Sequence, residues 1–390
     1  MKDVFIVSAV RTPVGKNKGY LRNWTAPELL GTVLDEVVKR IDLDPASIDD
    51  VINGTVSQIG EQGFTLARTG ILASKFPITV PGVSVNRQCG SSLTAIQLAA
   101  GMIASGTMDI VIASGCELLT KYTIQSDLNG TLFNGKPMGN PFGEYYTSKY
   151  GLPNQMLGAQ LIADQWGITR EQCNDFAISS HQKAHFATIH GYFKNEIMPM
   201  KGLDKDGNAI VMDKDEPIRP DTTEEKLNAL DVLPNTKFIT AGISSTITDG
   251  ASAVVLMSEA KMKELRLAPL ARIVASAVVG SDPKLMLTGP IYVTPKVLAK
   301  AGLSMDDIDI FEINEAFAPI PLAWLKELNA DKSKLNVNGG AIALGHPVGN
   351  SGCRLTITAI NELRRRNGRY ALVSLCTGGG MAPATIFERA

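Results

Sequence analysis

The sequence predicts an α/β protein that consists of two duplicated halves stacked in five layers, α/β/α/β/α. An apolar segment over 109–116 has the pattern of a buried strand that ends in a cysteine, and a segment of the same kind follows 260 residues later, over 369–376. Each is preceded by a helical pattern rich in small residues, over 91–103 and 352–363. Strands that alternate with helices at this spacing indicate α/β units with largely parallel sheets.

Further elements extend the repeat. Segments 48–52 and 308–313 add an earlier strand to each half, again with an offset of 260 residues. The helix over 91–105 is apolar on nearly all sides, which is typical of a helix buried between two sheets. We therefore expect an N-terminal half formed by 1–119 and 241–268, a loop domain over 120–240, and a C-terminal half over 269–390.

The region between the halves is less regular. Residues 131–150 are rich in Gly, Pro, Asn and Tyr without periodicity, and this pattern predicts a long loop. A helix is expected over 170–194, with Thr169 as its N-cap and Gln172 at the capping-box position. The charged segment 204–219 contains turn signals and predicts a small hairpin.

Composition narrows the class of protein. The 390 residues carry a net charge of −1, without the basic excess that nucleic-acid binding requires, so we expect no nucleic-acid partner. The five cysteines are widely spaced and form no CxxC pair, which argues against a disulfide framework and a structural zinc site. With no apolar run of 18 residues and no signal-peptide pattern, we expect a cytoplasmic protein without a membrane span.

Cys89 lies on a turn that leads directly into the helix over 91–103. The free N–H groups and the dipole at a helix N-terminus favour a thiolate, so the sequence predicts a lowered pKa and a nucleophile. A small apolar residue buried at a helix start is the alternative, and this segment alone does not decide between the two.

His346 lies between Gly345 and Pro347 in a glycine-rich segment, 338–352, where a rigid turn is expected. A hydrogen-bonded structural histidine would have the same pattern. His181 and His185 have the i, i+4 spacing of metal ligands, but no acidic residue completes an HExxH motif, so we expect no metal site.

Two further segments follow predicted strands. Cys376 ends the strand over 369–376 and is followed by Gly378, Gly379 and Gly380, while Asn314 follows the strand over 308–313. Sites in α/β sheets gather at the carboxyl ends of strands, so these groups are expected to meet near Cys89 and His346. A dinucleotide-binding loop is the rival interpretation of the glycines, but the GxGxxG pattern is absent.

Four motifs, VNRQCGSS, NEAFA, NVNGGAIALGHPVGNSG and CTGGG, resemble the thiolase family in both order and spacing, and the resemblance covers nearly the whole chain. It implies that Cys89 attacks an acyl-CoA thioester, that His346 takes the thiol proton, and that Cys376 is the general base. It also implies two sets of oxyanion donors: His346 with a water held by Asn314, and the backbone N–H groups of Cys89 and Gly378.

The resemblance further implies coenzyme A as a substrate, no cofactor, and a homodimer or homotetramer. Arg219, Ala241 and Ser245 would contact coenzyme A, and Met286 and Phe317 would line the acyl pocket, where Met286 favours a short chain. The activity that the resemblance favours is acetyl-CoA C-acetyltransferase. Alternatives are a 3-ketoacyl-CoA thiolase of longer chains, a non-catalytic thiolase-like subunit that binds coenzyme A or lipid, and a ketoacyl-synthase-like enzyme, although Cys376 stands where that last class has a second histidine.

Two positions depart from the family pattern. Asn154-Gln155 stand where many biosynthetic thiolases carry a histidine, and Met381-Ala382-Pro383 replace the more usual Gln-Gly sequence. The loop over 120–155 also departs from the family pattern, and together with the first departure it leaves the chain length of the acyl group and the contacts to pantetheine open.

Overall fold

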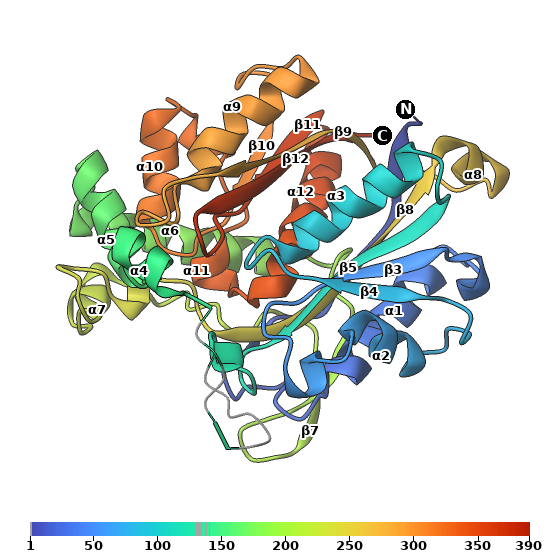
Figure 1. Ribbon diagram of the computed structural model, residues 1–390, viewed down its shortest axis with the longest axis horizontal. Helices are drawn as coiled ribbons and strands as arrows, with labels where there is room; N and C mark the ends of the chain where they lie inside the picture. The colour runs from blue at the N-terminus through green and yellow to red at the C-terminus, as the bar shows by residue number, and fades with distance from the viewer. Residues whose placement is uncertain (1, 129–134, 137–138, 140) are drawn as a thin grey trace.

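The computed structural model describes residues 2–128, 135–136, 139 and 141–390. Nine strands form one continuous sheet path in the order β10-β11-β12-β9-β1-β8-β5-β3-β4 (Figure 1), and the short β2 (Gly15–Lys16) pairs with β8. One group of strands is β1 (Val4–Arg11), β3 (Asp50–Gly54), β4 (Gly82–Val85), β5 (Ile110–Leu118) and β8 (Thr248–Ser258). The other group is β9 (Ala271–Gly280), β10 (Ile310–Ile313), β11 (Tyr370–Ser374) and β12 (Met381–Arg389).

The two groups are joined by a short antiparallel pairing of β1 with β9, in which Phe5 and Ile6 face Arg272 and Ala271. The prediction of largely parallel sheets is wrong. Parallel pairs occur where a helix connects the strands, in β3–β4, β3–β5 and β10–β11, whereas the other pairs in the described residues are antiparallel. β12 follows β11 after a short loop that reverses the chain, which can produce only an antiparallel neighbour.

The five predicted layers are present (Figure 1). Helices α3 (Ser91–Ala104) and α12 (Ser351–Arg366) lie side by side in the central layer and contact strands of both groups. Helices α1 (Ala26–Lys39) and α2 (Leu66–Leu72) cover the outer face of one group, and α9 (Gly289–Ala301) and α10 (Pro319–Glu327) that of the other. Three apolar cores fill the spaces between the layers: one under each outer pair of helices and one around the two central helices. The prediction that α3 is buried on nearly all sides is only partly met, because Leu98, Gly101 and Met102 form an exposed stripe along it.

The connecting region is more helical than predicted. The loop expected over 131–150 ends in a helix, α4 (Glu144–Tyr150), while 129–134, 137–138 and 140 lie outside the described residues. Helix α6 (Arg170–Ile189) has the predicted capping box between Thr169 and Gln172, but it ends five residues before the predicted end. The hairpin consists of β6 (Met200–Leu203) and β7 (Ala209–Met212), so most of the predicted segment 204–219 is its turn and the chain beyond it. Asp204 closes that turn by accepting from the backbone N–H groups of Asp206 and Asn208.

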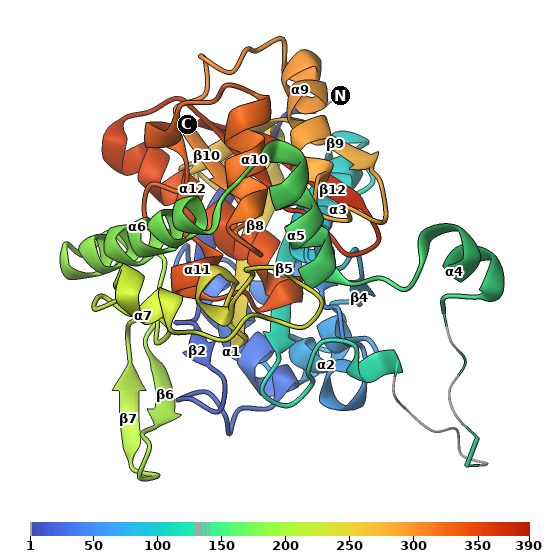
Figure 2. The same cartoon turned by 90° about the vertical axis from the view of Figure 1, so that its left-hand side faces the viewer.

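The remaining elements are short or lie at the periphery (Figure 2). The other α-helices are α5 (Gln155–Trp166), α7 (Glu224–Asn228), α8 (Glu259–Glu264) and α11 (Ala341–Leu344). The 3-10 helices are η1 (Pro45–Ser47), η2 (Gly60–Gln62), η3 (Ser126–Leu128), η4 (Ala241–Ile243), η5 (Lys332–Lys334) and η6 (Val348–Asn350). Within the described ranges, none of the helices has the length and apolarity needed to span a bilayer.

Candidate active site

Cys89 lies two residues before the N-terminus of the central helix α3, on a turn that is stabilised by hydrogen bonds from neighbouring side chains. The turn begins where β4 ends, and Gln88 adopts a left-handed backbone conformation with φ of 48°. The Asn86 side chain accepts from the Gln88 N–H at 2.8 Å, and the Ser91 hydroxyl accepts from the Arg87 N–H at 2.9 Å and donates to the Gln88 carbonyl at 2.6 Å. These local bonds fix the direction in which Cys89 points.

The Cys89 thiol is enclosed by protein although the residue is only half-buried. It packs against an apolar cluster of Val56, Leu119 and Val348. Burial raises the pKa of Cys89 to about 12, while hydrogen bonds from the backbone N–H groups of Cys89 and Gly378 act in the opposite direction. The expectation of a lowered pKa is therefore wrong for the free protein, because desolvation outweighs the favourable N–H groups of the turn.

The loop after β11 lies directly against this turn. A Cβ atom added at Gly90 would lie 2.7 Å from Pro383 and 2.9 Å from the Thr377 methyl group, and one at Gly378 would lie 3.2 Å from the Gln88 side chain. Gly379 and Gly380 turn the loop back with φ of 81° and 74°. The two predicted cysteine segments thus meet across a contact that leaves almost no room for side chains.

Cys376 is fully buried at the base of the same loop. Burial raises the pKa of Cys376 well above its ordinary value, and the neighbouring Cys89 thiol raises it further. A hydrogen bond with the Asn314 side chain acts the other way. The backbone N–H of Asn314 donates to the Ser374 carbonyl at 3.0 Å, so the ends of β10 and β11 bring Asn314 beside Cys376.

His346 is buried between α11 and α12, and both ring nitrogens have partners. Nδ1 lies 2.6 Å from the Ser351 hydroxyl, and Nε2 lies 3.3 Å from Nδ2 of Asn314. The Ser351 hydroxyl donates to the Pro347 carbonyl at 3.1 Å, so it accepts from His346, and this places the ring proton on Nδ1. The lone pair on Nε2 then faces Asn314. Burial, with a smaller contribution from Arg354, lowers the pKa of His346 to about 3, so the ring is neutral and can accept a proton.

Asn314 retains an unused acceptor. Its Oδ1 atom is buried and has no hydrogen-bond partner within the part of the chain that the structure describes. Buried polar atoms of this kind are usually satisfied by an ordered water or by a ligand. This free Oδ1 atom could hold the water that the sequence resemblance assigns to Asn314, which stays a prediction.

Glu117 is a buried residue of this site that the sequence analysis missed. Its carboxylate accepts from the backbone N–H groups of Val56 at 2.8 Å, Ser57 at 3.1 Å and Gly349 at 3.1 Å, and from the Gln62 side chain at 2.9 Å. It therefore ties the loop after β3 to the loop that carries His346, on either side of Cys89. The sequence feature that could have revealed Glu117 is its position, as an acidic residue directly after the apolar segment 109–116.

A separate cleft holds two of the three predicted coenzyme A contacts. Its lining residues come from α6, α7, η4, α11 and the loops beside them; they are His181, Arg219, Asp221, Thr222, Lys226, Leu227, Leu230, Ala241, Gly242, Ser244, Thr246 and Ile342. Ser245 is not in the lining. Its backbone N–H donates to the Ala316 carbonyl at 2.9 Å and so secures the loop between the cleft and the segment that follows β10.

His181 is a buried histidine in the wall of this cleft. Its Nδ1 atom accepts from the Arg219 N–H at 3.1 Å, and burial lowers the pKa of the ring to about 4. No group of three or more metal-ligating side chains occurs in the described ranges. His181 and Lys226 are lining residues that the sequence analysis did not assign.

Met286 and Phe317 are both buried in the apolar cluster that contains Cys376. Met286 lies in the loop between β9 and α9 with φ of 58°, and Met156 of α5 packs against the same cluster. The two predicted acyl-pocket residues thus share one apolar core with the second cysteine.

Comparison with known proteins agrees with this arrangement. Residues 4–260 match the family "Thiolase, N-terminal domain", and residues 267–389 match "Thiolase, C-terminal domain". The chain is 43% identical to the steroid 3-ketoacyl-CoA thiolase FadA6 of Mycobacterium tuberculosis, over 100% of this chain and 95% of that protein. It is 42% identical to a 3-ketoacyl-CoA thiolase of Serratia proteamaculans, over the full length of both.

Two solved structures share the whole fold. The acetyl-CoA acetyltransferase of Bacillus anthracis superposes with a TM-score of 0.91 at 39% identity, covering 100% of this chain and 99% of that one. Human mitochondrial 3-ketoacyl-CoA thiolase superposes with a TM-score of 0.89 at 36% identity and the same coverage.

Proposed function

Because the chain belongs to the thiolase family, whose members are acyltransferases that act on coenzyme A thioesters, we propose that Cys89 is its nucleophile and Cys376 its general acid and base. The observation that supports this assignment most directly is the contact between the two cysteine loops, with the Gly378 N–H hydrogen-bonded to Cys89. His346 and Asn314 complete the site as a hydrogen-bonded pair next to Cys376. Thiolases use coenzyme A as a substrate and need no additional cofactor.

In the thiolytic direction, the Cys89 sulfur attacks C3 of a 3-ketoacyl-CoA while Nε2 of His346 accepts the thiol proton. The C2–C3 bond then breaks, its electron pair takes the Cys376 proton, and acetyl-CoA leaves. A coenzyme A thiol gives its proton to Cys376 and attacks the acyl group on Cys89. Cys89 leaves as a thiolate and recovers the proton from His346, so every group returns to its starting state.

Negative charge develops on two carbonyl oxygens during these steps, and each requires preorganised donors. The N–H groups of Cys89 and Gly378 are suited to the oxygen of the acyl group on Cys89, since both already point at its sulfur. His346 and a water bound to Oδ1 of Asn314 are suited to donate hydrogen bonds to the thioester oxygen of the acetyl-CoA enolate.

The coenzyme A moiety would occupy the cleft lined by Arg219 and Ala241, with Ser245 placing the loop that leads inward to Phe317. Arg219 suits a phosphate group, because a guanidinium can donate two parallel hydrogen bonds to it. The Lys226 ammonium adds positive charge to the same wall, although it is paired with Asp221.

For the acyl group we propose a short chain, with acetoacetyl-CoA as the first substrate, since Met286 and Phe317 fill the core beside Cys376. A longer 3-ketoacyl-CoA is the second candidate, and it is favoured by the names of the curated relatives. We also propose a cytoplasmic location, which is consistent with five cysteines that are all free.

The test is the rate of thiolysis of acetoacetyl-CoA and of longer 3-ketoacyl-CoA thioesters by free coenzyme A. Cys89→Ala should abolish turnover on every substrate, whereas Cys173→Ala, which removes a buried thiol of helix α6 outside the site, should retain it. A wild type that is inert at every chain length would overturn the proposal and favour a non-catalytic binding subunit. Undiminished turnover by Cys89→Ala would overturn the assignment of the nucleophile.

A further inference from the structure

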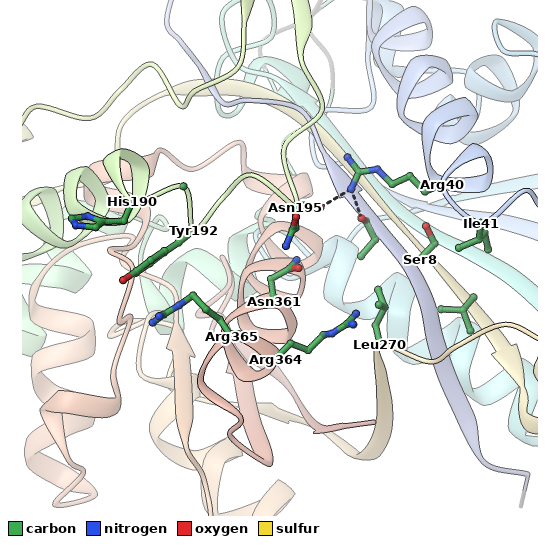
Figure 3. Close-up of a pocket in the computed structure, with 13 residues that line it drawn as sticks. Ser8, Arg40, Ile41, His190, Tyr192, Asn195, Leu270, Asn361, Arg364 and Arg365 are labelled. Carbon is green, nitrogen blue, oxygen red and sulfur yellow. Dashed lines mark hydrogen bonds between the residues drawn. The ribbon is translucent and has the colours of Figure 1, made fainter.

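A second hollow of about 810 Å³ lies at the other end of α12 (Figure 3). Helix α12 begins at Ser351, which contacts His346, and ends at Arg366. A helix of this length spans about 24 Å, so the hollow is remote from the cysteines. Its walls come from β1, the end of α1, the last turns of α12 and the segment 190–195, and we call it the α12 pocket.

The α12 pocket is lined by three arginines, Arg40, Arg364 and Arg365, and by no carboxylate among its described lining residues. The nearest paired carboxylates do not balance this charge. Glu36 is shared between Arg40 and Lys39, and Glu362 is shared between Arg365 and Arg366. Because each carboxylate serves two cations, the walls retain a positive excess.

Two of the arginines are placed to receive a ligand. Arg40 is held in position by the carbonyl oxygens of Asn195 at 2.7 Å and Ala9 at 3.1 Å. The structure gives the Arg364 side chain no hydrogen-bond or ion-pair partner within the described ranges. Figure 3 shows Arg40 and Arg364 extending into the pocket from opposite walls, with the Asn195 and Asn361 side chains beside the space between them.

The third arginine forms part of an aromatic wall. The Arg365 guanidinium lies 3.8 Å from the centre of the Tyr192 ring, and it is bonded to Glu362. His190 stacks on Phe186 next to Tyr192, with ring centres 3.9 Å apart. One end of the pocket therefore carries Arg40 and Arg364, and the other carries aromatic rings, with Arg365 on one face of Tyr192.

We propose that the α12 pocket binds a small organic diphosphate. Its volume is in the range of small-molecule sites, and its lining joins arginine donors to aromatic faces. Two guanidinium groups on opposite walls match two adjacent phosphates. Arg364 can bind one phosphate through paired N–H donors, and Arg40, whose Nε and Nη1 atoms already donate to protein oxygens, offers Nη2 to the other. The aromatic end at Tyr192 and His190 provides a surface for the organic part of the same molecule.

The test is calorimetric titration of ADP into the full-length protein at low salt. Coenzyme A also contains a diphosphate, so ADP could enter the cleft at Arg219, and the variants separate the two sites. We expect Arg364→Gln to weaken ADP binding at least tenfold, and Arg219→Gln to leave one binding event intact. Lys205→Gln, which removes an exposed charge from the turn of the β6–β7 hairpin, is the matched control and should bind as the wild type does.

Arg364 is exposed and outside the proposed catalytic groups, so Arg364→Gln should fold and should keep its rate of acetoacetyl-CoA thiolysis. Inorganic pyrophosphate should compete with ADP, since the phosphates supply the recognition, and added NaCl should weaken binding. The proposal is overturned if ADP does not bind, or if its binding is lost in Arg219→Gln and unchanged in Arg364→Gln.

Discussion

The reacting groups of this site are uncharged in the free protein. Burial keeps His346 neutral, with a pKa of about 3, and raises the pKa of Cys89 to about 12, so a thiolate–imidazolium pair is disfavoured before substrate arrives. If Cys89 is the nucleophile, as proposed, its proton transfer has to accompany attack on the substrate carbonyl, where the N–H groups of Cys89 and Gly378 would stabilise the new oxyanion. A neutral resting thiol is also a less reactive target for oxidants and alkylating agents.

The buried imidazole also makes stability depend on pH. An unfolded histidine has a pKa of about 6.5. Because the pKa of folded His346 is lower, the unfolded state binds more protons between pH 6.5 and 3, and the free energy of unfolding falls as the pH drops through this window. Above pH 6.5 the group contributes no pH dependence.

We therefore expect His346→Gln to lose less stability on acidification than the wild type. The drop in unfolding free energy between pH 7.5 and pH 5.0 should be smaller by about 2 kcal/mol in the variant. In the wild type, the unfolded histidine is protonated over the roughly 1.5 pH units between its pKa and pH 5.0, and each pH unit contributes about 1.36 kcal/mol. Urea denaturation at the two pH values measures this difference, and any uniform destabilisation by the substitution cancels.

His181 provides a comparison, because burial lowers its pKa to about 4. His181→Gln should change the pH dependence in the same direction, and the double variant should change it more than either single one. An unchanged acid-induced loss in His346→Gln would show that the pKa of this ring is not lowered in the folded protein.

At the residue scale, the sequence analysis predicted those site residues that directly follow a strand or directly precede a helix. Cys89, Cys376 and Asn314 occupy such positions, and the structure brings them together with His346. Glu117 escaped notice because its role depends on four partners from three separate segments, which no local pattern reveals. The pKa of Cys89 was predicted in the wrong direction, since it is raised by burial against Val56, Leu119 and Val348, which lie in three separate parts of the chain.

At the scale of elements, the site depends on a close crossing of the two central helices. A Cβ atom added at Gly352 of α12 would lie 2.3 Å from the Leu93 backbone nitrogen and 2.7 Å from its Cβ atom. Leu93 belongs to the first turn of α3, immediately after Cys89, and Gly352 belongs to the first turn of α12, next to the Ser351 that holds His346. The crossing therefore sets the separation between the turn that carries Cys89 and the loop that carries His346.

We expect Gly352→Ala to destabilise the protein by about 2 kcal/mol or more, because the contacted atoms are backbone and cannot move aside. Gly101→Ala is the matched control within α3. A Cβ at Gly101 would meet nothing within 4 Å, so alanine should stabilise the exposed helix by about 0.5–1 kcal/mol. Chemical denaturation of both variants measures the two effects, and changes of the same sign would contradict this account of the crossing.

The sequence predicted these elements to different degrees. The repeat located α3, α12, β5 and β11 within a few residues, because buried strands and all-apolar helices have strong periodic signals. Strand direction was predicted poorly. The chain crosses from β5 to β8 through more than 120 residues, and no local pattern shows that β8 returns antiparallel between β5 and β1.

At the scale of the whole molecule, β4 is an edge strand, and apolar side chains are exposed on the surface near it. It pairs with β3 on one side and has no second partner strand among the described residues. Four apolar side chains beside this edge are solvent-exposed: Phe64 at 91%, Ile78 at 77%, Leu72 at 55% and Val83 at 41%. Unpaired edges next to apolar surface are protected in stable proteins, commonly by a partner chain.

We propose that two copies of the chain pair through β4 about a twofold axis, and we expect Val83→Lys to dissociate them. A lysine at this position places a charge inside the paired edge, where it would lose its hydration. Light scattering after size exclusion should give the wild type a mass of at least twice 41.7 kDa and the variant a mass near that of one chain. Val211→Lys is the matched control, because Val211 is 71% exposed on β7, away from this edge. A monomeric wild type, or dissociation by Val211→Lys alone, would exclude β4 as the contact and leave its apolar surround without a role.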